Sequence, residues 1–351
     1  MRTSLGVVSA LLIVAAVFPA RAADRPPQLI AIAFDNCTEL SRWQELSDFA
    51  KEQNKDRDKI HFTFFVSGIN YLANEKRALY QGPHQARGYS MINFGGTSEE
   101  VAKRVVYMNE LKKLGHEVAS HAVGHFDGRA WSASDWQQEF KSYSGLLDNV
   151  ASNNALPDNV KFEFPSSSVI GFRAPYLANG AGLYAALKNS GFRYDTSGTS
   201  ESNLWPEKKD GIWRFNLASI RLHRSKRSTL SMDYNLFVAQ SFALDNSAPR
   251  IAHRDETLET YLDYFKGNYT GNRAPLHIGH HFTAYHGGVY NEALKVFIRR
   301  VCGLPEVQCV TYSKLADFMD GLSPETLQAY RNGNFPRAAL PVIDSTITFP
   351  N

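Results

Sequence analysis

The sequence has little excess of charge of either sign and almost no long hydrophobic run. Lys and Arg number 38 and Asp and Glu number 35 among 351 residues, so the formal net charge is +3. A chain this close to neutrality lacks the basic surface that nucleic-acid binding requires, and we expect no nucleic-acid partner. With 43% hydrophobic and 21% charged residues, the composition also excludes a disordered chain, a collagen-like fibre and a coiled coil.

Linkers and repeats are also missing. No Pro/Ser-rich segment divides the chain, and no self-similar unit recurs with a period of about 20 to 50 residues. The sequence therefore predicts a single domain over residues 23–351, which we expect to be a monomer.

The one apolar run stands at the N-terminus. Arg2 precedes an apolar stretch at 5–18, and Ala-Arg-Ala at 20–22 has the small-residue pattern of a cleavage site. Residues 1–22 thus read as a signal peptide; the alternative, a membrane anchor, requires a longer span. No other segment approaches 18 continuous apolar residues. We therefore expect an exported protein, secreted or periplasmic, with no membrane span after cleavage.

Cysteine is scarce, with only Cys37, Cys302 and Cys309. Export would place them in an oxidising compartment, where close cysteines form disulfides. Cys302 and Cys309 flank a short loop and are predicted to pair. Cys37 is then the odd residue: it can be a catalytic thiol or, as we favour, a small residue packed behind the site.

Strands alternate with helices along the chain. Buried-strand patterns lie at 29–34, 61–66, 116–120, 169–172, 192–194, 212–215, 230–232, 276–281 and 308–311, and helical patterns lie at 40–50, 98–114, 134–150, 182–190, 256–267, 290–301 and 313–319. The segment 68–97 has no clear period and reads as a long loop insertion. About seven β/α units in this order predict an α/β fold with a closed or nearly closed parallel barrel.

Polar clusters follow several of these strands. They are Asp35-Asn36, His121 with His125, Arg173-Ala-Pro-Tyr176, and His280-His281. Catalytic groups of such barrels gather at the C-terminal strand ends, so we expect these side chains to meet.

Two histidines four residues apart can lie on one side of a helical turn and face the same ion. His121 and His125 are therefore candidate metal ligands, and a third oxygen ligand would leave room for water. The neighbouring carboxylate of Asp35 is a candidate general base for that water.

A hydrolase also needs a group that protonates the leaving atom and a donor for the developing oxyanion. His281 is the candidate acid and the backbone N–H of Tyr176 the candidate oxyanion donor. Arg173 can keep Asp35 ionised and oriented through a charge-assisted hydrogen bond. The set predicts a hydrolase of amides or esters.

These motifs, in this order, resemble those of the polysaccharide deacetylases of carbohydrate esterase family 4. The resemblance covers nearly all of 23–351, and the segments 194–197, 204–206 and 272–281 look most like insect-type chitin deacetylases. It implies a distorted (β/α)7-type barrel, a site for zinc or another divalent ion, and removal of acetyl groups from N-acetylglucosamine units of a polysaccharide.

The resemblance also implies roles for single residues. Asp35 would be the base, His281 the acid, Arg173 the partner of Asp35 and Tyr176 the oxyanion donor, with Asn36, His121 and His125 at the metal. Asp195 and Trp205 fall on a further motif and would line the substrate site, and Asp233 would orient His281. Trp131 is added as an aromatic side chain able to stack on a sugar ring.

Asn36 departs from the family pattern, which has aspartate there. An amide oxygen can ligate a divalent ion but brings no charge, so we expect weaker metal binding. The leading hypothesis is a secreted chitin or chitooligosaccharide N-deacetylase. The alternatives are a peptidoglycan deacetylase, a carbohydrate-binding relative without catalysis, and a general acyl esterase.

Overall fold

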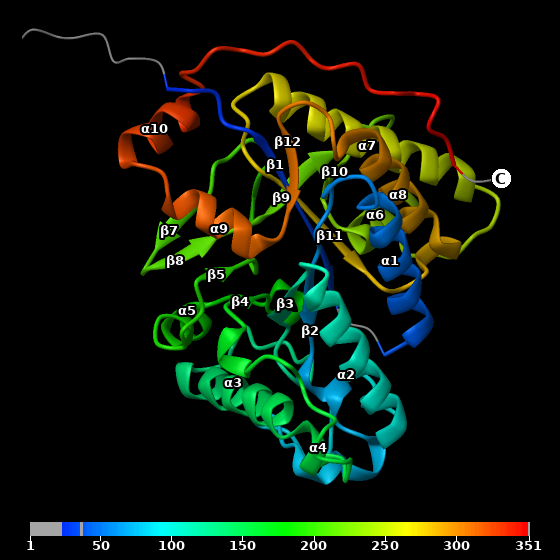
Figure 1. Ribbon diagram of the computed structural model, residues 1–351, viewed down its shortest axis with the longest axis vertical. Coiled ribbons are helices and arrows are strands. Elements are labelled where there is room, and N and C mark those ends of the chain that lie inside the picture. Colours follow the sequence, from blue (N-terminus) through cyan, green and yellow to red (C-terminus); the bar gives the residue numbers. More distant parts are fainter. Residues whose placement is uncertain (1–22, 36–37, 350–351) are drawn as a thin grey trace, which may run out of the picture.

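The computed structural model describes residues 23–35 and 38–349, and a curled, mostly parallel sheet forms its centre (Figure 1). The main path of the sheet runs β11 (Leu276–His281), β1 (Gln28–Asp35), β2 (Thr63–Val66), β3 (Glu117–Ser120), β4 (Gly171–Phe172), β5 (Tyr194–Asp195), β8 (Ile212–Arg214) and β7 (Glu207–Lys209). Strand β12 (Val307–Val310) also pairs with β1. Strand β7 runs antiparallel to β8, and the other strand pairs described in this sheet are parallel.

A second, three-stranded sheet stands beside β11. It comprises β10 (Ser228–Leu230), β9 (Leu217–Arg221) and β6 (Thr199–Glu201), and an isolated bridge joins Met232 to Gly279 of β11. The parallel ladder is therefore interrupted rather than closed. The expected α/β fold of a distorted (β/α)7-type barrel is confirmed, in the form of a curled half-barrel.

Helices surround this sheet, with α1, α7 and α8 on one side of β1 in Figure 1 and α9 and α10 on the other. The α-helices are α1 (Leu40–Gln53), α2 (Ser98–Lys113), α3 (Ala133–Asp148), α4 (Val150–Asn153), α5 (Ala181–Leu187), α6 (Asp233–Ser241), α7 (Arg250–Thr270), α8 (Val289–Val301), α9 (Tyr312–Asp320) and α10 (Pro324–Asn332). Short 3₁₀ helices are η1 (Gly68–Tyr71), η2 (Asn74–Leu79), η3 (Ser166–Ser168), η4 (Pro175–Leu177) and η5 (Tyr285–Gly288).

Three helices begin at or next to their predicted positions. Helix α2 begins at 98 as predicted, and α3 and α9 begin one residue before the predicted 134 and 313. Their N-cap side chains are those of Thr97, Ser132 and Thr311. At α2 and α3 the acidic residue at the third helical position, Glu100 or Asp135, bonds back to the cap. This reciprocal pair satisfies two backbone donors, and so it determines where the helix begins.

Strand β1 sorts its side chains onto two faces. Ile30, Ile32 and Phe34 pack in the large core between the sheet and the helices, whereas Leu29, Ala31 and Ala33 belong to a smaller cluster inside the curl of the sheet. Since neighbouring strand residues alternate, Asp35 shares the inner face with the alanines. The small residues leave room inside the barrel for larger partners from the other strands.

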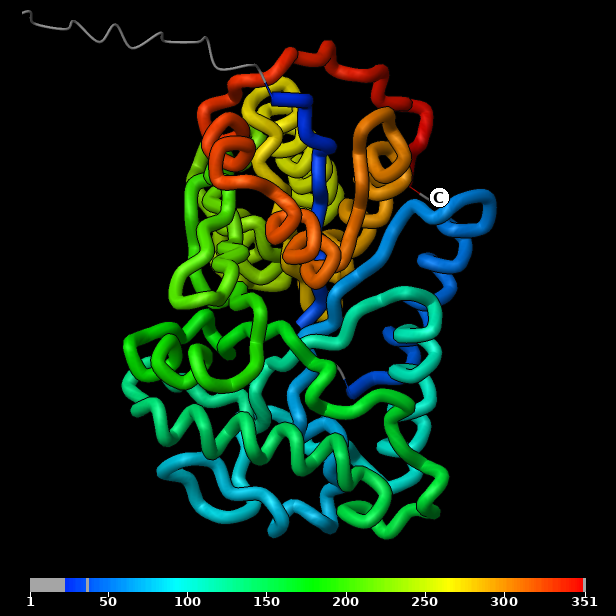
Figure 2. Tube along the Cα trace, turned by 60° about the vertical axis from the view of Figure 1, so that its left-hand side comes forward, coloured from blue at the N-terminus to red at the C-terminus, as the bar shows by residue number. Residues whose placement is uncertain are grey.

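The C-terminal segment returns to the start of β1. It crosses the top of the molecule as the red tube in Figures 1 and 2, beside the N-terminal residues. Arg25 donates to the carbonyls of Pro336 and Arg337 and pairs with Glu306. These contacts fasten the entry to the central strand.

The predicted leader, 1–22, lies outside the described residues. In 23–35 and 38–349, none of the helices is both long enough and apolar enough to span a membrane. Export and cleavage of the leader remain predictions.

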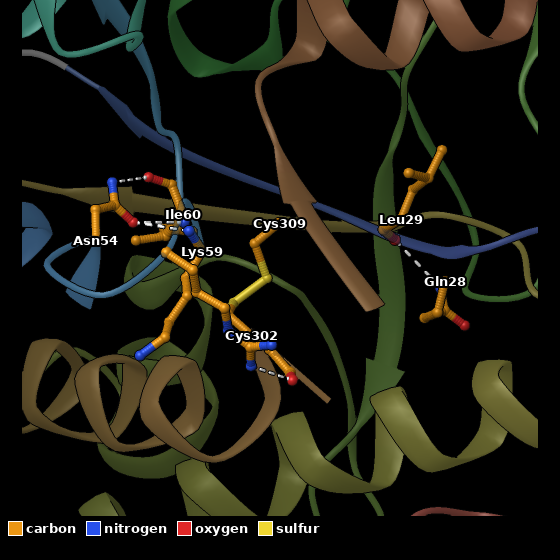
Figure 3. Close-up of a disulfide and its surroundings, with 9 residues drawn as sticks. Gln28, Leu29, Asn54, Lys59, Ile60, Cys302 and Cys309 are labelled. Carbon is orange, nitrogen blue, oxygen red and sulfur yellow. Dashed lines mark hydrogen bonds between the residues drawn. A yellow bond between two sulfur atoms is a disulfide. The ribbon is translucent and has the colours of Figure 1, made fainter. Parts of the chain in front are cut away.

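The predicted disulfide between Cys302 and Cys309 is confirmed (Figure 3). The disulfide joins the end of α8 to β12. The backbone of Cys309 also forms an isolated parallel β-bridge with Ile60, which precedes β2. The disulfide therefore ties a helix to the strand that supports β1. Cys37 lies outside the described residues.

Replacing both Cys302 and Cys309 by alanine should lower the free energy of unfolding. Their separation in sequence is 7 residues, and closing a loop of this size is worth about 2–3 kcal/mol in chain entropy. Urea unfolding of the oxidised protein measures the difference. The control is the wild-type protein in reductant, whose free energy of unfolding should equal that of the double variant. A double variant as stable as the oxidised wild type would contradict the assignment.

Candidate active site

Asp35 and His281 occupy matching positions at the ends of neighbouring parallel strands. Asp35, the last residue of β1, is paired in register with His281, the last residue of β11. Both lie on the inner face, because His277 of β11, four residues earlier, stacks on Tyr312 of the inner cluster. The structure thus brings the two proposed proton-transfer groups to one edge of the sheet.

Arg173 joins this edge from the loop after β4. Its Nη1 donates to Asp35 Oδ1 at 2.6 Å, and its Nε donates to Thr196 Oγ1 at 2.8 Å. The guanidinium carbon also lies 4.2 Å from the centre of the Phe65 ring. With side-chain exposures of 0% for Arg173 and 3% for Asp35, this is a fully buried ion pair. The carboxylate of Asp35 is therefore fixed in orientation.

His121 and His125 come together in a loop, not on a helical turn. Strand β3 ends at Ser120, and the next residues leave it with left-handed backbone at Ala122 (φ 57°) and His125 (φ 56°). The two imidazole centres are 5.1 Å apart. The expectation that both rings approach each other holds, but the helical reason for it is wrong.

The ring nitrogens of this pair suit a metal. His121 Nδ1 lies 2.8 Å from the carbonyl oxygen of Arg173, so a proton on Nδ1 leaves Nε2 free as a ligand. His125 Nδ1 is buried and has no hydrogen-bond partner among the described residues. Burial lowers the pKa of His121 and lowers that of His125 to about 3, which favours the neutral rings that a metal requires as ligands.

Two histidines alone do not complete a metal centre. Within 23–35 and 38–349, there is no group of three or more His, Cys, Asp or Glu side chains arranged to hold an ion. The third ligand predicted from the sequence, Asn36, lies outside the described residues. His121 and His125 therefore fit a divalent ion, and the remaining ligand stays a prediction.

Asp233, at the start of α6, holds His281 at two points. Its Oδ2 accepts from the backbone N–H of His281 at 2.8 Å, and its Oδ1 lies 2.7 Å from Nδ1. Burial opposes charge on the ring, but the negative charge and hydrogen bond of Asp233 outweigh it and raise the pKa of His281 above 6.5. Since Nδ1 is occupied, proton exchange with a ligand is left to Nε2. The side chain is 23% exposed, so solvent or a ligand can reach it.

His280 points to the other face of the same strand. Its ring is fully buried, with Nε2 2.9 Å from Tyr261 Oη and Nδ1 3.0 Å from Asn291 Oδ1. Both ring nitrogens are occupied by neighbouring helices. The alternation expected from the strand period therefore separates a packing histidine from the candidate acid, His281.

Tyr176 lies beside the histidine pair. It has left-handed backbone (φ 57°), and its ring, 54% exposed, meets the His125 ring at 4.8 Å between centres. No hydrogen bond from the Tyr176 N–H to another described residue is present. Such strained backbone at a site is consistent with a donor held ready for a ligand. Its role as an oxyanion donor stays a prediction.

Two predicted substrate residues are buried in the protein. Asp195 is 0% exposed, and its carboxylate bonds to Ser197 and pairs with Arg214 at 3.1 Å. Trp205 is 6% exposed and donates from Nε1 to the carbonyl of Asn272. Neither side chain is placed where a sugar could touch it. We correct both assignments. Asp195 supports the loop at Ala174 through Ser197. Trp205 packs on Tyr330 of α10, near the start of β11.

Trp131, the third predicted substrate residue, is partly exposed, and its ring meets that of Trp136 at 4.9 Å between centres. Sugar contact by Trp131 stays a prediction.

The residue Thr196 was missed as a site residue, although it follows β5 as the other polar clusters follow their strands. Its hydroxyl is the second partner of the Arg173 guanidinium, and the neighbouring Ser197 hydroxyl accepts from the Ala174 N–H. The signal that could have found both is the position after a strand end.

An open pocket lies beside Phe282, the residue that follows His281 in the sequence. It has a volume of about 450 Å³ and is lined by Thr38, Glu39, Arg42, Asn70, Met91, Ile92, Asn93, Phe282, Thr283 and Ala284. Both polar and apolar groups line it, and its size is in the range of small-ligand sites. His281 itself is not among the residues that line this pocket.

Comparison with solved structures places the fold. A candidate polysaccharide deacetylase from Mycobacterium smegmatis aligns with 93% of this chain and 99% of its own length, with a TM-score of 0.53 and 15% identity. A second from Pseudomonas aeruginosa PAO1 aligns with 85% of this chain and 93% of its own, with a TM-score of 0.50 and 12% identity. The Puue allantoinase aligns with 85% of this chain and 92% of its own length, with a TM-score of 0.51 and 12% identity.

Neither the family models nor the curated protein sequences give a match to this chain. At such low identity the structural likeness defines the fold and leaves the substrate open, since an allantoinase shares it. It agrees with the resemblance that the strand-end motifs carry. The chain has the fold of the polysaccharide deacetylases.

Proposed function

We propose that this protein is a metal-dependent polysaccharide N-deacetylase that releases acetate from N-acetylglucosamine polymers, with chitin or chitooligosaccharides as its substrates. One observation carries the proposal: Asp35 and His281 stand in register on the inner face of the sheet. Arg173 pairs with Asp35, and Asp233 pairs with His281. Arg173 fixes the orientation of the carboxylate, and Asp233 raises the pKa of the imidazole. Hydrolysis of an amide requires such a pair of base and acid.

Asp35 accepts the proton of the attacking water. Its carboxylate is bonded to the Arg173 guanidinium at one oxygen, Oδ1, so the other oxygen is available for water. His281 donates a proton from Nε2 to the leaving amine, because Asp233 occupies Nδ1 and stabilises the imidazolium. The acid and the base therefore act from neighbouring strands on one acetamide.

His121 and His125 would hold the divalent ion, together with Asn36. Bound there, zinc or a related ion would supply Lewis acidity that polarises water and the acetyl carbonyl. The N–H of Tyr176 would stabilise charge that develops on the carbonyl oxygen. The ring of the same residue, exposed beside His125, is placed to contact a sugar.

The pocket beside Phe282 has a volume that would fit a sugar unit of a longer chain. We propose that the protein acts after export, in the secreted or periplasmic space, where such polymers lie. Peptidoglycan is the alternative polymer. A binding protein without catalysis is the alternative function, favoured by the neutral ligand Asn36.

Acetate release from chitin oligomers, from purified peptidoglycan and from a monoacetylated ester tests the proposal. Each assay is run after chelation and again with added Zn²⁺. We expect Zn²⁺-dependent release from chitin oligomers, and a fall of about 10²-fold or more in turnover for Asp35→Asn, as for loss of a general base. The double variant His121→Ala/His125→Ala should lose Zn²⁺ and turnover together.

Several outcomes would contradict this proposal. Release from peptidoglycan alone would move the substrate to the alternative polymer, and release from the ester alone would identify an acyl esterase. Tight binding of chitin oligomers with no release from any substrate would identify a binding protein.

The pH profile tests the role of Asp233. The raised pKa of His281 keeps the acid protonated to higher pH, so the basic limb of kcat/KM should lie above pH 6.5. In Asp233→Asn the negative charge is lost and the pKa of His281 falls. The basic limb should then move to lower pH, by about one unit or more for a contact ion pair.

Asp263→Asn is the matched control. Asp263 pairs with the Nδ1 of His223 at 2.7 Å, as Asp233 pairs with His281, but both members of that pair are partly exposed and belong to α7 and to the turn after β9. Its pH profile should match that of the wild type. An unshifted profile in Asp233→Asn would show that His281 is not the group that titrates.

A further inference from the structure

Glu139 of α3 is a buried carboxylate that reaches the loop between the two candidate metal ligands. Its side chain is fully buried, and its Oε1 accepts from the backbone N–H groups of Val123 and Gly124, each at 3.0 Å. These two amides lie between His121 and His125. No other side-chain acceptor bonds to them in the described part of the chain.

This loop needs support from outside itself. Ala122 and His125 both have left-handed backbone, which residues other than glycine adopt only where their surroundings impose it. The bonds from Glu139 fall on the two residues between these strained positions. The carboxylate thus holds the segment whose path decides where the His125 ring lies relative to the His121 ring.

Glu139 is itself held by the long insertion after β2. The hydroxyl of Tyr80 donates to the carboxylate, with both oxygens at 3.0 Å. Gly124 passes so close to the Tyr80 hydroxyl and the Phe126 ring that a Cβ there would collide with both. The carboxylate therefore has little freedom to move away from the loop.

We propose that Glu139 is a positioning residue that holds His121 and His125 in the arrangement that binds a divalent ion. The inference rests on the proposed function, since it concerns the same metal site. Glu139 acts through the backbone of the loop and touches neither substrate nor ion. Its replacement should therefore change the affinity for the metal more than it changes the rate of the chemical step.

The chain offers a matched control in Glu256. This residue of α7 is also buried, and its Oε1 accepts from two consecutive backbone amides, those of Arg224 and Ser225, at 3.0 and 3.2 Å. Gln240 donates to its other oxygen. Glu256 therefore has the same structural duty as Glu139, on a loop without candidate ligands.

Zn²⁺ affinity of the full chain, measured by calorimetry after chelation, tests the proposal beside urea unfolding of the same proteins. Glu139→Ala should weaken Zn²⁺ binding by about 10- to 100-fold, the effect typical of groups that orient metal ligands. Glu139→Asp keeps the charge but retracts the carboxylate from the amides, and it should weaken binding by about 10-fold. Glu139→Gln keeps the accepting oxygen and should bind nearly as tightly as the wild type.

Glu256→Ala should lose stability but keep wild-type Zn²⁺ affinity. If Glu139→Ala does not fold, Glu139→Asp decides the question. Wild-type affinity in Glu139→Asp, or an equal loss in Glu256→Ala, overturns the positioning role and leaves the proposed function intact. A wild-type protein that binds no Zn²⁺ rejects the metal-dependent function and the positioning role together, so the two failures can be told apart.

Discussion

The buried ion pair between Arg173 and Asp35 is the interaction on which the rest of the site depends. Both side chains are almost wholly excluded from water, and their atoms meet at 2.6 Å. Removing one partner of such a pair leaves an uncompensated buried charge, at a cost of about 3–5 kcal/mol. The strands and loops around it must therefore keep the guanidinium in place, and Thr196 and the Phe65 ring do so.

Arg173 also connects the acid–base pair to the histidine pair. Its guanidinium bonds to Asp35, while its backbone carbonyl fixes the Nδ1 of His121. One residue after β4 thus orients groups that come from β1 and from the loop after β3. The pairing of β1 with β11 places His281 beside Asp35. The partner of His281 is the negatively charged Asp233, whereas the partner of Asp35 is the positively charged Arg173. The site is a consequence of register, alternation and two oppositely charged partners.

The sequence predicts the parallel strands of the main sheet and the strand-end motifs, because buried runs and the polar residues directly after them are local features. It misses β6, β7 and β9; β6 and β7 are three-residue, largely exposed strands that leave no buried run in the sequence. The choice of His281 over His280 followed from the family resemblance of the segment 272–281, and alternation then places His280 on the opposite face of the strand. What required the structure was non-local. Asp195 and Trp205 look like site residues by position, yet partners distant in sequence, Arg214 and Asn272, draw them into the interior. The left-handed residues in the loop that brings His121 to His125 are Ala122 and His125, not glycines, so the sequence gives no sign of this conformation. The support from Glu139 comes from α3, a helix whose sequence shows no functional motif.

The central claim is that Arg173 and Asp35 act as one unit in amide hydrolysis. A double-mutant cycle of Asp35→Asn and Arg173→Met, read as kcat/KM for acetate release from chitin oligomers, tests it most directly. Each single variant should lose about 10²-fold or more, and the double variant should be no more than about threefold worse than the poorer single, because residues that act together are not additive. Losses that multiply, to about 10⁴-fold in the double variant, would show that the two residues contribute independently and would contradict this account.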